Sequence, residues 1–85
     1  MKVLKVVNPA NGKLEATLPA DDAKSVRAKY ERARAAQPRW AKTRLKQRLD
    51  AIRKFRELVV AQTETLARVL TAEVGKPISQ SRNEL

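Results

Sequence analysis

The sequence predicts an α+β fragment, in which an N-terminal β-hairpin is followed by three to four α-helices. Two observations predict it. Residues 3–18 hold two short runs with strand patterning around a turn signal, and residues 22–85 repeat apolar side chains at spacings of three and four. With 85 residues the chain is too short for two domains, so we expect residues 1–85 to form a single partial domain. Proline and glycine signals divide the helical part into 22–37, 44–61, 63–74 and 77–85.

The hairpin is predicted by two strand-like runs. Residues 3–7 are mostly β-branched, and residues 14–18 alternate apolar and polar side chains. Asn11-Gly12 between them is the pair that tolerates the positive φ angles of a two-residue primed turn. Because two strands alone are marginal in water, we expect the hairpin to lie against helices or against a larger sheet that this chain does not contain.

The first helix is expected to begin at an acidic cap, Asp21 or Asp22, and to end before Pro38. Its apolar stripe is thin, with Val26 and Tyr30 as the large members among alanines. Trp40 then falls in a connector, where we interpret it, together with Tyr30, as a packing anchor rather than as a ligand clamp.

The second helix is the clearest amphipathic segment, with Thr43 expected as its cap. Its apolar positions are Leu45, Leu49, Ile52, Phe55 and Val59. Gly75 should end the third helix in the left-handed conformation, and Lys76 is interpreted as part of the basic last turn rather than as a phosphate contact. Pro77 should open the fourth helix, which stops at Leu85 without a terminator, so we expect the sequence to continue.

Composition excludes several reaction classes, because the chain has no Cys, no His and only two Gly. It therefore lacks the groups for a thiol nucleophile, a Cys/His zinc site or a Ser-His-Asp triad. Gly12 and Gly75 are too few for a dinucleotide fingerprint, and Met1 holds the one sulfur atom. We therefore expect no catalytic, no cofactor-binding and no metal-binding residue, and no cofactor bound by this chain.

The formal net charge is +10, and it is concentrated in residues 24–56. That range holds thirteen basic side chains against Glu31 and Asp50. Two interpretations are open: an anion-binding surface, or the solvated faces of two amphipathic helices. Nonspecific nucleic-acid binding is expected at low salt from charge alone. No apolar run approaches the roughly 18 residues of a membrane helix and no signal peptide can be drawn, so we expect no membrane association and a cytoplasmic location.

Several landmarks occur in an order that resembles a known family. They are Asn8-Pro9-Ala10-Asn11-Gly12-Lys13, Leu18-Pro19, the helix end Ala35-Ala36-Gln37-Pro38-Arg39-Trp40, and Glu73-Val74-Gly75-Lys76-Pro77. The chain resembles the N-terminal segment of NAD(P)-dependent aldehyde dehydrogenases, including the succinate-semialdehyde type. The resemblance implies that it is the peripheral part of an α/β cofactor domain. In the family the catalytic Cys, the general-base Glu, the oxyanion Asn and the nucleotide site all come later, so none is carried over.

The function implied is that of an N-terminal fragment of an oxidoreductase whose parent reaction turns an aldehyde into a carboxylic acid with NAD or NADP. The chain alone is expected to be inactive. Its expected partner is the remainder of the parent enzyme or another copy of itself, since so few large apolar residues leave little core. The alternative is a small basic helical module that binds an anionic or protein partner.

Overall fold

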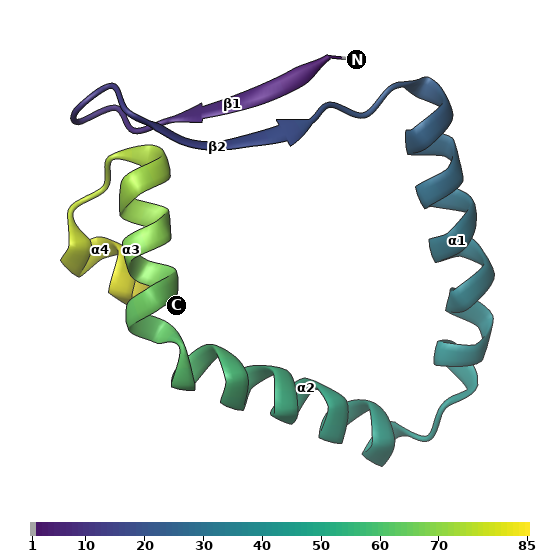
Figure 1. Ribbon diagram of the computed structural model, residues 1–85. Helices are drawn as coiled ribbons and strands as arrows, with labels where there is room; N and C mark the ends of the chain where they lie inside the picture. The colour runs from purple at the N-terminus through teal and green to yellow at the C-terminus, as the bar shows by residue number, and fades with distance from the viewer. Residues whose placement is uncertain (1) are drawn as a thin grey trace.

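The computed structural model describes residues 2–85, which form one antiparallel hairpin and four helices (Figure 1). The predicted α+β class is confirmed. The elements are β1 Val3–Val7, β2 Leu14–Pro19, α1 Ala23–Lys42, α2 Leu45–Ala61, α3 Thr63–Val74 and α4 Ile78–Glu84.

The hairpin pairs Val3 with Pro19 at one end and Val7 with Leu14 at the other, with an irregularity in the register between Val6 and Val7. Its turn is longer than the predicted two-residue one. Within the described chain only glycines have positive φ, and Gly12 has φ 74°, so a primed turn centred on Asn11-Gly12 is wrong.

A loop of six residues, 8–13, joins the strands instead. The Asn8 carbonyl accepts the Gly12 N–H at 2.8 Å, and the Asn8 N–H donates to the Lys13 carbonyl at 2.9 Å. The side-chain oxygens of Asn8 and Asn11 each accept a backbone N–H two residues on, at 2.9 and 2.8 Å. The asparagine side chains therefore hold the loop closed, and the positive φ in this loop is that of Gly12.

α1 begins at a reciprocal cap. The Asp22 carboxylate accepts the Ser25 N–H at 2.8 Å, and the Ser25 hydroxyl accepts the Asp22 N–H at 2.9 Å. Hydrogen bonds to the Asp22 carboxylate, first from the Ser25 backbone N–H and then from the Ser25 side chain, lower the pKa of Asp22. The prediction of an acidic cap is confirmed, with Asp22 as the residue.

α1 does not end before Pro38 as predicted, since it runs through Pro38 to Lys42. Pro38 removes one backbone donor, but four residues without a helix breaker follow it and extend the helix by another turn. Trp40 consequently lies in α1 and not in a connector. The Thr43 N–H and hydroxyl both donate to the Arg39 carbonyl, at 3.1 and 2.9 Å, so Thr43 closes α1 and the prediction that it caps the second helix is wrong.

α2 begins after Arg44, which makes no side-chain cap bond. α3 has the predicted bounds, and Gly75 ends it in the left-handed conformation with φ 77°. Pro77 is the residue before α4 rather than its first residue.

The best-packed unit is the pair α3 and α4. Ala67 and Ser81 are fully buried between them, and the Ser81 and Thr71 hydroxyls lie 2.8 Å apart. The Arg82 guanidinium donates two hydrogen bonds to the Glu64 carboxylate, at 2.7 and 2.9 Å. These bonds tie the seven-residue α4 to α3.

The other elements follow one another around a ring, with the hairpin above the end of α3 (Figure 1). The Cα radius of gyration is 17.3 Å, whereas a compact chain of this length has about 12 Å. The exposed surface is 7560 Å², against about 5,100 Å² for a compact protein of this mass. The chain therefore holds most of its apolar side chains outside any core.

Candidate functional site

The structure brings together no group of three or more His, Cys, Asp or Glu side chains that could hold a metal among residues 2–85. Two serine hydroxyls serve the fold: Ser25 completes the α1 cap and Ser81 bonds Thr71. The expectation that this chain contains no catalytic residue stays a prediction. Met1, with its sulfur atom, lies outside the described residues.

The two glycines do not form a phosphate cradle for a nicotinamide dinucleotide. Gly12 lies in the hairpin loop with open space where a side chain would begin. Gly75 lies against Pro9, and a Cβ there would be 2.8 Å from the Pro9 Cγ. Successive glycines that let a phosphate approach the backbone are therefore missing from the described residues.

Lys76 contacts Glu84 of α4, so its placement in the last turn of α3 is wrong. The left-handed Gly75 ends α3 one residue earlier and turns the chain, which brings the end of α4 beside Lys76. Tyr30 and Trp40 lie ten residues apart on α1 and remain 63% and 45% exposed. Their role as packing anchors stays a prediction, because no described element covers either side chain.

A shallow hollow of about 390 Å³ separates β2 from α3. Glu15 and Ala16 line it from the strand, and Arg68, Val69, Ala72 and Glu73 line it from the helix. Its lining mixes carboxylates, a guanidinium and small apolar groups, without a nucleophile paired to a base. The hollow indicates incomplete packing between the two elements.

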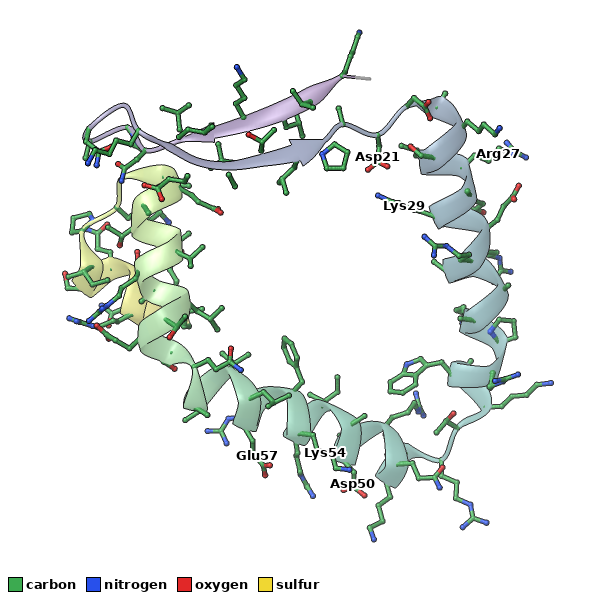
Figure 2. The ribbon with its side chains drawn as sticks, in the orientation of Figure 1. Asp21, Arg27, Lys29, Asp50, Lys54 and Glu57 are labelled. Carbon is green, nitrogen blue, oxygen red and sulfur yellow. The ribbon has the colours of Figure 1, made fainter. Side chains whose placement is uncertain are left out.

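α2 carries an exposed apolar surface. Leu45, Ile52 and Phe55 are 62%, 58% and 64% exposed, and Leu49 is also exposed. The charged residues Asp50, Lys54 and Glu57 point away from the centre of the ring (Figure 2). Helical spacing puts the apolar residues on the opposite side. We call this side the inner face of α2, and it comprises Leu45, Arg48, Leu49, Ile52, Phe55 and Arg56.

The apolar surface extends from α2 into α3. A groove of about 210 Å³ lies at the junction of the two helices. It is lined by Phe55, Leu58, Val59, Gln62 and Leu66. Because four of the five lining residues are apolar, the groove suits an aliphatic or aromatic side chain from a partner surface.

The charges follow a different pattern. Of the thirteen basic residues in 24–56, three form ion pairs: Arg27 with Glu31 at 3.2 Å, Lys29 with Asp21 at 2.8 Å and Arg53 with Asp50 at 3.7 Å. The other ten form none with any described residue. The Lys29 hydrogen bond is the main cause of the lowered pKa of Asp21. Most of the positive charge of residues 24–56 thus has no counter-charge among the described residues.

Sequence reasoning missed the contacts between α3 and α4. Glu64 and Arg82 are eighteen residues apart, and no local pattern links them. The Arg82 hydrogen bonds lower the pKa of Glu64, and the same bonds raise the pKa of Arg82. The signal available in the sequence was the Gly75-Lys76-Pro77 turn, which brings two helices together without fixing which side chains meet.

Among residues 2–85 no helix combines the length and the hydropathy required to cross a bilayer.

The amino-acid sequence is similar to proteins of a known family. The model of the protein family described as "Aldehyde dehydrogenase family" matches this chain over residues 1–85.

Three relatives illustrate the match. The chain is 33% identical over 84 residues to glutarate-semialdehyde dehydrogenase of Pseudomonas putida, covering 99% of this chain and 18% of that protein. It is 36% identical over 80 residues to a probable succinate-semialdehyde dehydrogenase (NADP(+)) of Sinorhizobium fredii, covering 94% and 16%. It is 32% identical over 84 residues to succinate-semialdehyde dehydrogenase (NADP(+)) of Escherichia coli, covering 99% and 17%.

The chain thus spans less than a fifth of the length of these relatives. The order of landmarks from Asn8 to Pro77 had predicted the same kinship, and that prediction is confirmed. This hairpin and these four helices belong to the aldehyde dehydrogenase family.

Proposed function

We propose that this chain is a structural segment of an aldehyde dehydrogenase and that it supplies packing surface rather than reacting groups. The observation that carries the proposal is the exposed apolar surface. Seventeen large hydrophobic side chains are exposed, while Ala67 is the one buried hydrophobic residue among those described. Exposed apolar area on this scale marks an interaction surface rather than a finished domain.

The reaction of the whole enzyme is proposed from its relatives. Those described above are named for semialdehydes, and two of the three for NADP(+). We infer that the whole enzyme oxidises an aldehyde of this class to the carboxylic acid, with NAD or NADP as hydride acceptor. The nucleophile and the cofactor site would come from parts of the enzyme that this chain does not span, and we place the enzyme in the cytoplasm.

A chimera tests the proposal. In the Escherichia coli relative, the 84 aligned residues are replaced by this chain, and a second variant lacks them. We expect the chimera to be soluble and to form NADPH from succinate semialdehyde, and the deletion variant to do neither. The isolated chain should form no reduced nicotinamide. Turnover by the isolated chain, or full activity of the deletion variant, contradicts the proposal.

A paired substitution in the chimera locates the packing surface. Ile52→Asp puts a charge on the inner face of α2, whereas Lys54→Asp changes the side that points away from the ring (Figure 2). We expect Ile52→Asp to abolish soluble chimera and Lys54→Asp to leave it intact, because an unpaired buried carboxylate is costly. Equal tolerance of both substitutions would show that the inner face remains in water.

A second candidate function is a basic module for an anionic or protein partner. The observation in its favour is the set of ten basic side chains without ion pairs among the described residues. Nonspecific binding of nucleic acid falls steeply with salt. Binding of a single defined partner that survives physiological salt would favour this module, and binding that disappears by about 0.2 M salt would count against it.

A further inference from the structure

The two sides of α2 differ in whether their charged residues form ion pairs. The side that points away from the ring carries both acidic and basic residues, namely Asp50, Lys54 and Glu57 (Figure 2). Asp50 also pairs with Arg53 at 3.7 Å. On the inner face the positive residues are Arg48 and Arg56, each four positions from Ile52. Residues four apart lie on one side of a helix, so the two arginines flank the apolar surface.

Neither arginine has a counter-charge in the described chain. The Arg48 Nε donates to the Thr43 carbonyl at 3.0 Å, which fixes its stem and leaves its other donors free. Arg56 comes eight positions after Arg48 in the helix, so the two positions lie about 12 Å apart along the axis.

A surface that covers Leu49, Ile52 and Phe55 must also cover these guanidinium groups. Arginine stays protonated in proteins, so it cannot escape burial by losing its charge. An unpaired charge in a water-excluded interface is strongly unfavourable, whereas a carboxylate paired with the planar guanidinium satisfies it. The covering surface therefore needs a carboxylate opposite each arginine.

A second copy of this chain does not meet that requirement. Two copies joined at their inner faces would bring Arg48 and Arg56 of one against the same residues of the other. The nearest carboxylates, Asp50 and Glu57, are on the opposite side of the helix (Figure 2). Each copy also carries a formal charge of +10, which repels the other.

We propose that the inner face of α2 docks an apolar protein surface bearing two carboxylates about 12 Å apart, one for Arg48 and one for Arg56. The groove of about 210 Å³ at the end of α2 takes an apolar side chain of the same surface. That this surface belongs to the rest of an aldehyde dehydrogenase rests on the proposed function. That it is apolar and bears two carboxylates is inferred from the residues of the inner face of α2 alone.

Two amphipathic helical peptides test the chemistry. Both carry the same leucine stripe; one has two glutamates eight positions apart beside the stripe, and the other has glutamines there. Binding to the whole 85-residue chain is measured by fluorescence anisotropy near physiological salt. We expect the glutamate peptide to bind about tenfold more tightly.

The variants locate the effect. Arg48→Gln with Arg56→Gln should remove the preference for the glutamate peptide. Lys46→Gln with Lys54→Gln is the matched control, since it removes the same charge at the same spacing from the other side of α2, and it should keep the preference within about twofold. Circular dichroism checks that each variant keeps its helix content.

Equal losses in the two double variants would show that only net charge matters, and would overturn the proposal. Equal binding of the two peptides to the unaltered chain would do the same. The peptides contain no dehydrogenase sequence, so these results do not depend on whether the chimera is active. A failed chimera with a preserved glutamate preference would remove the assignment to the enzyme and leave the docking chemistry.

Discussion

Replacing Gly75 by alanine perturbs the contact between the hairpin loop and α3. Gly75 has φ 77°, and a Cβ built there lies 2.8 Å from the Pro9 Cγ. A left-handed residue with a Cβ costs about 1–2 kcal/mol, and the contact with a rigid proline ring adds strain that the loop must relieve by moving. The conformational part alone corresponds to about a five- to thirtyfold rise in local opening.

Amide hydrogen exchange measured by NMR at low temperature reads this opening residue by residue. In Gly75→Ala we expect faster exchange of the Gly75-position N–H, which donates to the Thr71 carbonyl at 2.9 Å, and of the Asn8 and Gly12 amides across the contact. Gly12→Ala is the control, because Gly12 has φ 74° but no atom within 4 Å of an added Cβ. Gly12→Ala should speed the exchange of the loop amides and leave the exchange of the α3 amides unchanged.

A double variant isolates the steric part. Pro9→Ala removes the Cγ that the new methyl group would meet, so adding it to Gly75→Ala should restore the loop amides toward the exchange of Pro9→Ala alone. The α3 amides should stay fast, since the left-handed strain remains. If Gly75→Ala disturbs the loop equally with and without the Pro9 ring, the inferred contact is wrong.

Three further predictions concern single elements. The pKa of Glu64 is lowered, chiefly by the Arg82 hydrogen bonds, so the stabilisation from this pair is complete above the ordinary glutamate pKa and is lost as pH falls through the lowered one. The protection of the α4 amides, with the intrinsic exchange rate at each pH divided out, should therefore fall as pH drops below the ordinary glutamate pKa of about 4.3, and Glu64→Gln should reduce this pH dependence. Ser81→Val leaves the Thr71 hydroxyl without its partner and should cost about 1–3 kcal/mol of local stability, read from exchange in α3 and α4 and unaltered in α1. Pro38→Ala restores a backbone donor within α1, which should stabilise the helix by up to about 3 kcal/mol and change the helix signal at 222 nm little, because residues 39–42 are already helical; a large rise in that signal would show that α1 ends at Pro38 in the unaltered chain.

The sequence predicted the elements better than it predicted their ends. The amphipathic spacing of α2 and the glycine after α3 are strong local signals. The predicted helix and the predicted left-handed end at Gly75 are both confirmed. Pro38 misled because proline is a stop signal only on average. The residues after it continue the helix, and the missing donor leaves a single carbonyl without its partner. Thr43 misled in the same way, since its hydroxyl bonds backward to the Arg39 carbonyl instead of forward to α2.

The candidate surface could be predicted only in part. The apolar positions of α2 were evident from their spacing, but their exposure is a property of the ring and not of the helix. The contrast between paired charges on one side and unpaired Arg48 and Arg56 on the other needs the ion pairs of the folded chain. The composition gives the net positive charge. It does not distinguish a binding surface from the solvated face of a helix.

Ala67 is the one buried hydrophobic residue among residues 2–85, and calorimetry of the isolated chain tests most directly whether so small a core can support cooperative unfolding. A cooperative globular protein of 85 residues absorbs about 60 kcal/mol on unfolding, in a single sharp transition. We predict a broad transition with a small fraction of that heat. A sharp two-state peak near the full value, independent of protein concentration, would contradict the account.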